Sequence, residues 1–198
     1  CCHATGRLFL GRKVTRGKSL ILSADDTQED LEAVLALVVK AMHLTEFEVE
    51  MVRGNVTIVS LLGLDGVRAF STTVAGVGIV ETDMVFELQR ATADLDHLVF
   101  VFIDTLRQFS GGSSNDEQIM RNIIGGCSEF AAAKGVYVVL AHHVGKGNYR
   151  DAVNDQYAAT GSSVIADNAR FVWLLMAVTW GEVSDKVKRT ANEDGDPL

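Results

Sequence analysis

Short apolar runs alternate along this chain with segments whose apolar residues recur at helical spacing. The apolar runs predict strands over residues 19–24, 56–62, 98–103, 136–141 and 171–178. The periodic segments between them predict helices over residues 28–43, 82–95 and 116–134. Strands that are apolar throughout are typical of a sheet covered on both faces. The pattern therefore predicts an α/β fold with three layers, α/β/α, around a mainly parallel central sheet.

Two of the predicted helices carry an apolar stripe that we expect to face the sheet. In the helix over 28–43 the stripe consists of Leu31, Val34, Leu35, Val38, Val39 and Met42. In the helix over 116–134 it consists of Ile119, Ile123, Cys127 and Phe130, and Gly135 is the expected helix stop. We expect Trp173 and Trp180 to pack in the core or at its edge rather than to stack on bases.

Parallel α/β proteins bind ligands at the carboxyl ends of their strands, which selects the residues to consider. These are Asp25 and Asp26 after the first strand, Asp104 and Thr105 after the third, and His142 and His143 after the fourth. In LVFVFIDTLRQF the apolar strand ends at Asp104, which would offer Mg²⁺ a hard oxygen ligand on a rigid strand end. The alternative is that Asp104 caps the next turn.

The other strand ends also leave alternatives open. A carboxylate here could orient or deprotonate a water that attacks a phosphate, or Asp25 or Asp26 could be the N-cap of the helix that begins near Gln28. For Asp26 the cap is the better explanation, and both roles can coexist. Adjacent histidines point to opposite sides of an extended chain, so His142 and His143 are not expected to chelate zinc together. One of them would sense a phosphate by hydrogen bonding, or the pair is only a polar strand end.

One tempting motif fails. Gly17-Lys18-Ser19 has the last three residues of a phosphate-binding loop, but the glycine spacing before it is wrong and a strand follows instead of a helix.

Composition narrows the class of protein. The chain has 198 residues, 47% of them hydrophobic, which excludes wholesale disorder and suits one domain over 1–198. Three cysteines do not suggest a disulfide framework and fit a cytoplasmic protein, and the absence of a long apolar run argues against a membrane span. The net charge of −8 opposes nucleic-acid binding over the whole surface but leaves room for a local basic channel.

Four blocks in order resemble RepA-type hexameric replicative helicases and related RecA-like P-loop ATPases. They are LILSADDT, FIDTLRQF, LAHHVGKG and TGSSVIADNARFVW. The resemblance implies a RecA-like fold and an enzyme that couples hydrolysis of Mg²⁺-bound ATP to movement along single-stranded DNA. It also implies a homo-oligomer, a hexameric ring with ATP between subunits.

Carried over to matching positions, the resemblance implies a role for each strand-end residue. Asp104 would hold Mg²⁺ with Thr105 beside the nucleotide, and Asp25 would activate water with Asp26 next to it. His142 would sense the γ-phosphate, and Arg170 would reach the nucleotide of the neighbouring subunit. Segments 106–115 and 144–159 would face DNA, with Arg107, Lys146 and Arg150 against phosphates.

The chain also departs from the family pattern. Asp25 stands where the family has glutamate, Thr160 stands where it has arginine, and the family's phosphate-binding loop would precede Cys1. These departures motivate two alternatives: a non-catalytic RecA-like module in a DNA replication or maintenance assembly, and a recombination-type RecA-like ATPase.

Overall fold

The computed structural model describes residues 1–64, 69–113, 115–143, 163–173 and 175, and its centre is a parallel sheet. The strands are β1 (Lys18–Ser23), β2 (Val56–Ser60), β5 (Leu98–Asp104) and β6 (Tyr137–Leu140). They pair in the order β2-β1-β5-β6, with every pairing parallel. Four of the predicted strands are thus confirmed, and all four end at one edge of the sheet.

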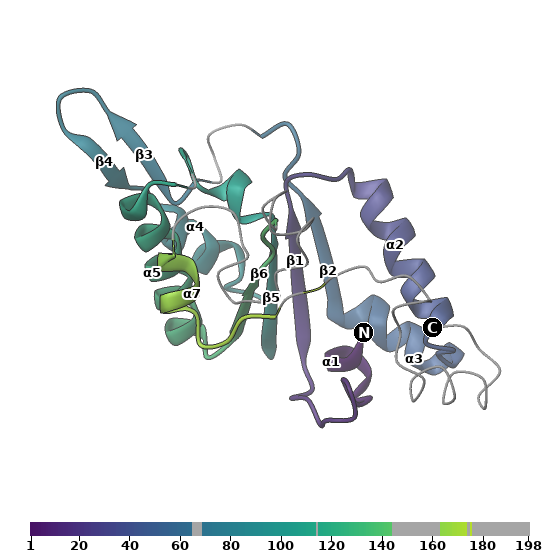
Figure 1. Ribbon diagram of the computed structural model, residues 1–198. Coiled ribbons are helices and arrows are strands. Elements are labelled where there is room, and N and C mark those ends of the chain that lie inside the picture. Colours follow the sequence, from purple (N-terminus) through teal and green to yellow (C-terminus); the bar gives the residue numbers. More distant parts are fainter. Residues whose placement is uncertain (65–68, 114, 144–162, 174, 176–198) are drawn as a thin grey trace, which may run out of the picture.

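Helices cover both faces of this sheet (Figure 1). One layer holds α1 (Cys2–Thr5), α2 (Gln28–Ala41) and α3 (Glu46–Asn55). The opposite layer holds α4 (Met84–Ala91), α5 (Glu117–Lys134) and α7 (Val164–Asn168). The predicted three-layer α/β/α, RecA-like architecture is confirmed.

Helix α5 forms the main core with the sheet. Its N-cap, Asp116, accepts hydrogen bonds from the backbone N–H groups of Gln118 and Ile119, and Gly135 ends it in the left-handed region at φ 67°. The whole predicted stripe of this helix is buried. Burial raises the pKa of the Cys127 thiol to about 12, so this cysteine stays protonated and acts as an apolar core residue.

Helix α2 is present as predicted, but its apolar stripe is only partly covered. Val34 and Val38 are exposed, and none of the helix residues is fully buried. The reason is that α2 packs on the edge strand β2 instead of over the middle of the sheet. The expectation that the complete stripe faces the sheet is wrong.

The structure differs from the sequence-based expectation at a hairpin and near the end of the described chain. An antiparallel hairpin, β3 (Ser71–Val74) with β4 (Gly78–Glu81), was not predicted and projects beside α5 (Figure 1). The described residues of the strand expected over 171–178, namely 171–173 and 175, adopt no strand. Trp173 is 60% exposed, so the prediction that it packs in the core or at its edge is also wrong. The reason is that the described residues 171–173 and 175 pair with no neighbouring strand. Trp180 lies outside the described residues.

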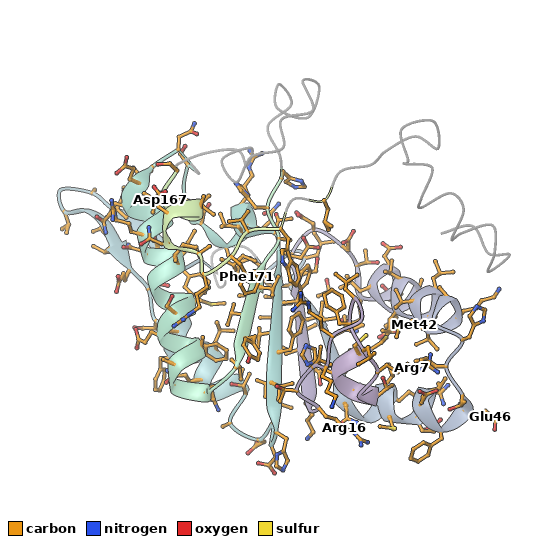
Figure 2. The ribbon with its side chains drawn as sticks, turned by 60° about the horizontal axis from the view of Figure 1, so that its bottom comes forward. Arg7, Arg16, Met42, Glu46, Asp167 and Phe171 are labelled. Carbon is orange, nitrogen blue, oxygen red and sulfur yellow. The ribbon has the colours of Figure 1, made fainter. Side chains whose placement is uncertain are left out.

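A salt bridge between Arg7 and Glu48 fixes the corner between α2 and α3. Figure 2 shows Arg7 close to Met42 at this corner. Arg7 Nε and Nη2 donate to the two carboxylate oxygens of Glu48 at 2.6 and 2.8 Å, and Arg7 Nη1 donates to the carbonyl oxygen of Met42 at 2.6 Å. Met42 is the C-cap of α2, and Glu48 forms a capping box with Thr45 at the start of α3. One guanidinium therefore joins the end of one helix to the start of the next.

None of the helices in the described part of the chain is both long enough and apolar enough to cross a membrane.

Candidate functional site

The strand register brings the predicted strand-end residues together. Ser23 of β1 is paired with Asp104 of β5 on one side and with Ser60 of β2 on the other. Just beyond the strands, the backbone N–H of Ala24 donates to the carbonyl oxygen of Asp104 at 2.8 Å. The chain after β1 therefore runs beside the chain after β5, which places Asp25 next to Thr105.

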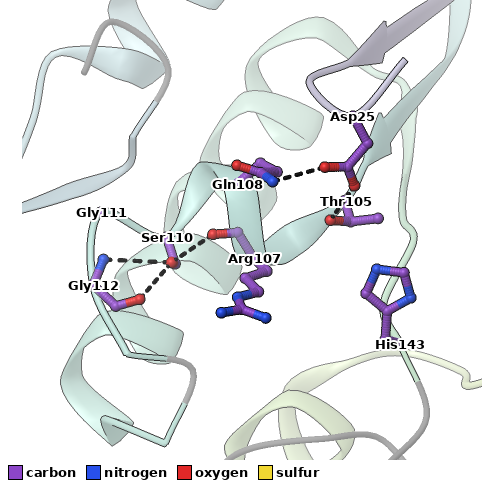
Figure 3. A pocket seen from close by; sticks show the side chains of 8 residues that line it. All are labelled: Asp25, Thr105, Arg107, Gln108, Ser110, Gly111, Gly112 and His143. Atoms are coloured by element: carbon purple, nitrogen blue, oxygen red, sulfur yellow. Dashed lines mark hydrogen bonds between the residues drawn. The ribbon is translucent and has the colours of Figure 1, made fainter. Parts of the chain in front are cut away.

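Two side chains hold the carboxylate of Asp25 (Figure 3). Thr105 Oγ1 donates to Asp25 Oδ2 at 2.9 Å, and Gln108 Nε2 donates to Asp25 Oδ1 at 2.7 Å. Gln108 belongs to the 3₁₀ turn η1 (Leu106–Phe109), which is anchored by two fully buried side chains, Leu106 and Phe109. Segment 106–115, which the resemblance implies would face DNA, thus begins with an ordered turn that orients Asp25.

Asp26 does not cap the following helix. The N-cap of α2 is Thr27, whose hydroxyl accepts from the backbone N–H of Asp30 at 3.2 Å. The carbonyl oxygen of Asp26 accepts from Ser60 Oγ at 2.7 Å, which ties the turn after β1 to the end of β2. The predicted cap role of Asp26 is therefore wrong, because Thr27 is the residue with the extended backbone required at that position.

Asp104 lies in a negative environment at the end of β5. Its pKa is raised above its usual value mainly by burial and then by the negative charges of Asp25 and Asp26. His143 and a hydrogen bond from Ser23 act in the opposite direction. The N-cap of the following turn η1 is Thr105, so the alternative that Asp104 caps this turn is wrong.

A pocket of about 440 Å³ opens beside these residues (Figure 3). Besides Asp25 and Thr105, it is lined by residues 107, 108, 110–112 and 143. Ser110 Oγ lies 2.7 Å from the carbonyl oxygens of Arg107 and Gly112, which holds the turn closed. Gly111 has φ 67°, and a Cβ there would collide with the carbonyl oxygen of Ser71, so this wall requires glycine.

The pocket is lined by nitrogen-bearing side chains from two regions. They are the guanidinium of Arg107 in η1 and the imidazole of His143, which follows β6. Of the histidine pair, His143 lines this pocket, whereas His142, the residue predicted as the phosphate sensor, is not among the lining residues. Successive side chains of an extended segment point to opposite sides, so the sequence already indicated that the two histidines would differ in this way. Sequence reasoning gave no role to Gln108 and Ser110, because their contacts depend on the fold of η1.

Of the other predicted site residues, Arg170 follows α7 and is exposed, and Lys146 and Arg150 lie outside the described residues.

Gly17-Lys18-Ser19 lies at the start of β1, at the edge of the sheet opposite Asp25. A Cβ on Gly17 would meet the carbonyl oxygen of His97 at 2.5 Å, so this glycine packs against the chain before β5. Rejecting a phosphate-binding loop here is confirmed.

A comparison with protein families agrees with this arrangement. The family model AAA_25, described as an AAA domain, matches residues 1–149. The chain belongs to this AAA domain family. The match includes β1, β5 and β6 with the strand-end residues that line the pocket. AAA domains are P-loop ATPases that bind a nucleotide and usually Mg²⁺.

The residues of this AAA domain fit a magnesium nucleotide. The pKa of Asp104 is raised first by burial and then by the negative charges of Asp25 and Asp26, and a divalent cation would offset those charges. Within the described ranges, no three His, Cys, Asp or Glu side chains form a metal-binding group. Mg²⁺ needs no such group, since it is usually held by one or two carboxylates, waters and phosphate oxygens. The Arg107 guanidinium and the glycine backbone of the pocket wall suit the phosphates.

Proposed function

We propose that this protein is a DNA-dependent ATPase that forms a ring and acts as a replicative DNA helicase. The observation that supports the ATPase part best is the site itself. Asp25 and Asp104 end adjacent parallel strands, and Asp25 is held from both oxygens by Thr105 and Gln108. A fixed carboxylate beside a cation-binding carboxylate is the arrangement that phosphoryl transfer to water requires.

Asp25 would orient the attacking water and accept its proton. Each of its carboxylate oxygens already accepts one hydrogen bond, and each keeps a lone pair for a water. The two donors restrict rotation of the carboxylate, so the base is held in one orientation before the substrate binds.

Asp104 would hold the cation. When bound there, Mg²⁺ would supply positive charge that offsets the negative charge developing on the phosphates. Because the pKa of Asp104 is raised, a larger share of this carboxyl is protonated in the absence of a cation than for an ordinary aspartate at the same pH. Mg²⁺ affinity should therefore fall on acidification at a higher pH than for an isolated aspartate.

The ring and the DNA belong to the same proposal and are supported by the resemblance of the four sequence blocks. Arg170 is exposed after α7, where a neighbouring subunit can approach it. Single-stranded DNA would contact segments 106–115 and 144–159 through Arg107, Lys146 and Arg150, and His142 would couple the γ-phosphate to DNA.

The test is an ATPase assay of the purified protein with and without single-stranded DNA. Asp104→Asn and Asp25→Asn should each lower the rate about 100-fold or more, since they remove the cation ligand and the base. The matched control is Asp96→Asn, an exposed carboxylate before the other end of β5. Equal rates for Asp25→Asn and Asp96→Asn would contradict the assignment of Asp25.

The helicase part has its own measurement, strand separation on forked DNA. ATP-dependent separation that is lost in Asp104→Asn would support it. ATP hydrolysis stimulated by DNA without strand separation would instead support a recombination-type ATPase. Failure to bind ATP and Mg²⁺ at all would support a non-catalytic module.

A further inference from the structure

The beginning of the chain carries positive charge that the rest of the protein does not share. Residues 1–24 contain five Lys or Arg and no Asp or Glu, although the net charge of the whole chain is −8. A concentrated basic segment in an acidic protein indicates a local site for an anionic partner.

This segment is shaped by a tight hairpin turn. The backbone N–H of Phe9 donates to the carbonyl oxygen of Arg12, and the reverse hydrogen bond is also formed, both at 2.9 Å. Between them Leu10 and Gly11 have φ values of 49° and 74°, as in a type I′ turn. Residues paired in this way project their side chains from the same face, so the Phe9 ring and the Arg12 guanidinium share one face of the hairpin.

Aromatic rings from a distant part of the chain meet this turn. The ring of Phe9 lies 5.7 Å from the ring of Trp173, which in turn lies 5.2 Å from the ring of Phe171. The three residues are 41%, 60% and 57% exposed, respectively. They form a row of aromatic rings open to solvent, which is the kind of platform on which nucleobases stack.

The cationic side chains of Arg12, in the hairpin turn, and of Lys13, which follows it, are able to bind phosphates. Arg7 is engaged by Glu48, but neither Arg12 nor Lys13 forms an ion pair with any described residue, and both are exposed. They can therefore neutralise phosphates without first breaking an ion pair with any part of the protein that the structure describes.

We propose that this basic–aromatic surface, made of Phe9, Arg12, Lys13, Phe171 and Trp173, is a binding site for single-stranded nucleic acid. Bases would stack on the row of rings while Arg12 and Lys13 contact the phosphates. The surface shares no residue with the Asp25 pocket or with the segments proposed above to face DNA, and binding to it would not depend on ATP hydrolysis. An acidic protein would need only the cations, whereas the exposed ring row favours a ligand with flat aromatic groups.

The experiment is fluorescence anisotropy of a labelled oligothymidylate titrated with the purified protein at several salt concentrations, without nucleotide. Phe9→Ala should weaken binding about fivefold or more, because one base loses its stacking partner. Arg12→Ala should weaken it and reduce the slope of log affinity against log salt by about 1. Lys40→Ala, which removes an exposed cation from α2, is the matched control and should change neither quantity.

Three outcomes would overturn the proposal. One is unchanged affinity in both Phe9→Ala and Arg12→Ala when circular dichroism shows that the fold is retained. Another is loss of all binding in Arg107→Ala with no effect of Arg12→Ala, which would assign the DNA to the other surface. A third is equal competition by polyglutamate, which would indicate an acidic protein partner. Asp25→Asn should leave binding unchanged, so failure of the ATPase proposal and failure of this one are distinguishable.

Discussion

At the scale of single residues, the position of the Asp25 carboxylate depends on the two side chains that donate hydrogen bonds to it. Asp25 is one methylene shorter than the glutamate implied by the resemblance, and displacement of a reacting group by about 1 Å can cost about 100-fold in rate. Thr105 and Gln108 fix the shorter side chain through bonds of 2.9 and 2.7 Å. We therefore interpret Gln108 as a positioning residue for Asp25.

Gln108→Ala should lower kcat of the proposed ATPase about tenfold or more while changing KM little, because orientation of the base is lost and ATP binding is not. Gln108→Arg keeps a donor at this position and should retain more activity than Gln108→Ala. Gln118→Ala, on the exposed face of α5, is the control. A change in KM with unchanged kcat would show that Gln108 acts on binding instead.

Sequence reasoning found Asp25, Thr105 and Asp104 because each follows an apolar strand, and strand ends share an edge in a parallel sheet. It gave no role to Gln108 because that contact is made by a side chain 83 positions from Asp25 and depends on how η1 folds. Residue spacing along the chain does not encode such a contact.

At the scale of elements, the apolar pattern predicted an element wherever that pattern was strong, as in α5 and also in the little-buried α2, and it missed elements in which that pattern was weak. The stripe of α5 is fully buried and was predicted correctly, whereas α3 buries only Val52 and was not predicted. The short hairpin of β3 and β4 has a mostly exposed pattern, so it offered no apolar run to detect. At residues 171–173 the opposite happened: the apolar run predicted a strand, but these residues are exposed and pair with no strand of the sheet.

The joint between α2 and α3 should be sensitive to pH. Hydrogen bonding to Arg7 and then to Thr45 lowers the pKa of Glu48 from 4.5 to about 2. A lowered pKa means that the ionised carboxylate stabilises the folded state above pH 4.5, and that this contribution is lost as the pH falls from 4.5 towards 2.

Glu48→Gln should therefore lower the free energy of unfolding at pH 7, and the difference from the unchanged protein should shrink below pH 4.5. Urea unfolding of both proteins at a series of pH values measures this difference in the free energy of unfolding. Glu50→Gln is the control, since Glu50 pairs with Arg53 on the exposed surface of the same helix. A constant difference at every pH would mean that Glu48 acts through packing and not through its charge.

At the scale of the whole molecule, the proposed ring requires that one site use residues of two subunits. Arg170 is exposed and forms no ion pair with the described residues of its own subunit. These are the properties expected of a residue that serves a neighbouring subunit.

Arg170→Ala and Asp104→Asn should each be inactive alone, and mixing them should restore up to about a quarter of the original ATPase rate, because some interfaces then combine two intact residues. Mixing Arg170→Ala with the double variant Arg170→Ala/Asp104→Asn should restore nothing. The absence of recovery in the first mixture, with mixed rings verified by native mass spectrometry, would refute action between subunits.

The parallel pairing of β1 with β5 also has a consequence for synthesis of the protein. Asp25 and Thr105 are 80 positions apart, so the ribosome completes the second partner roughly 4 to 16 seconds after the first. During that interval β1 can pair with β2 alone, and its other edge stays open. The nascent chain is therefore most exposed to mispairing before β5 emerges, and chaperones that bind apolar strands would act in that window.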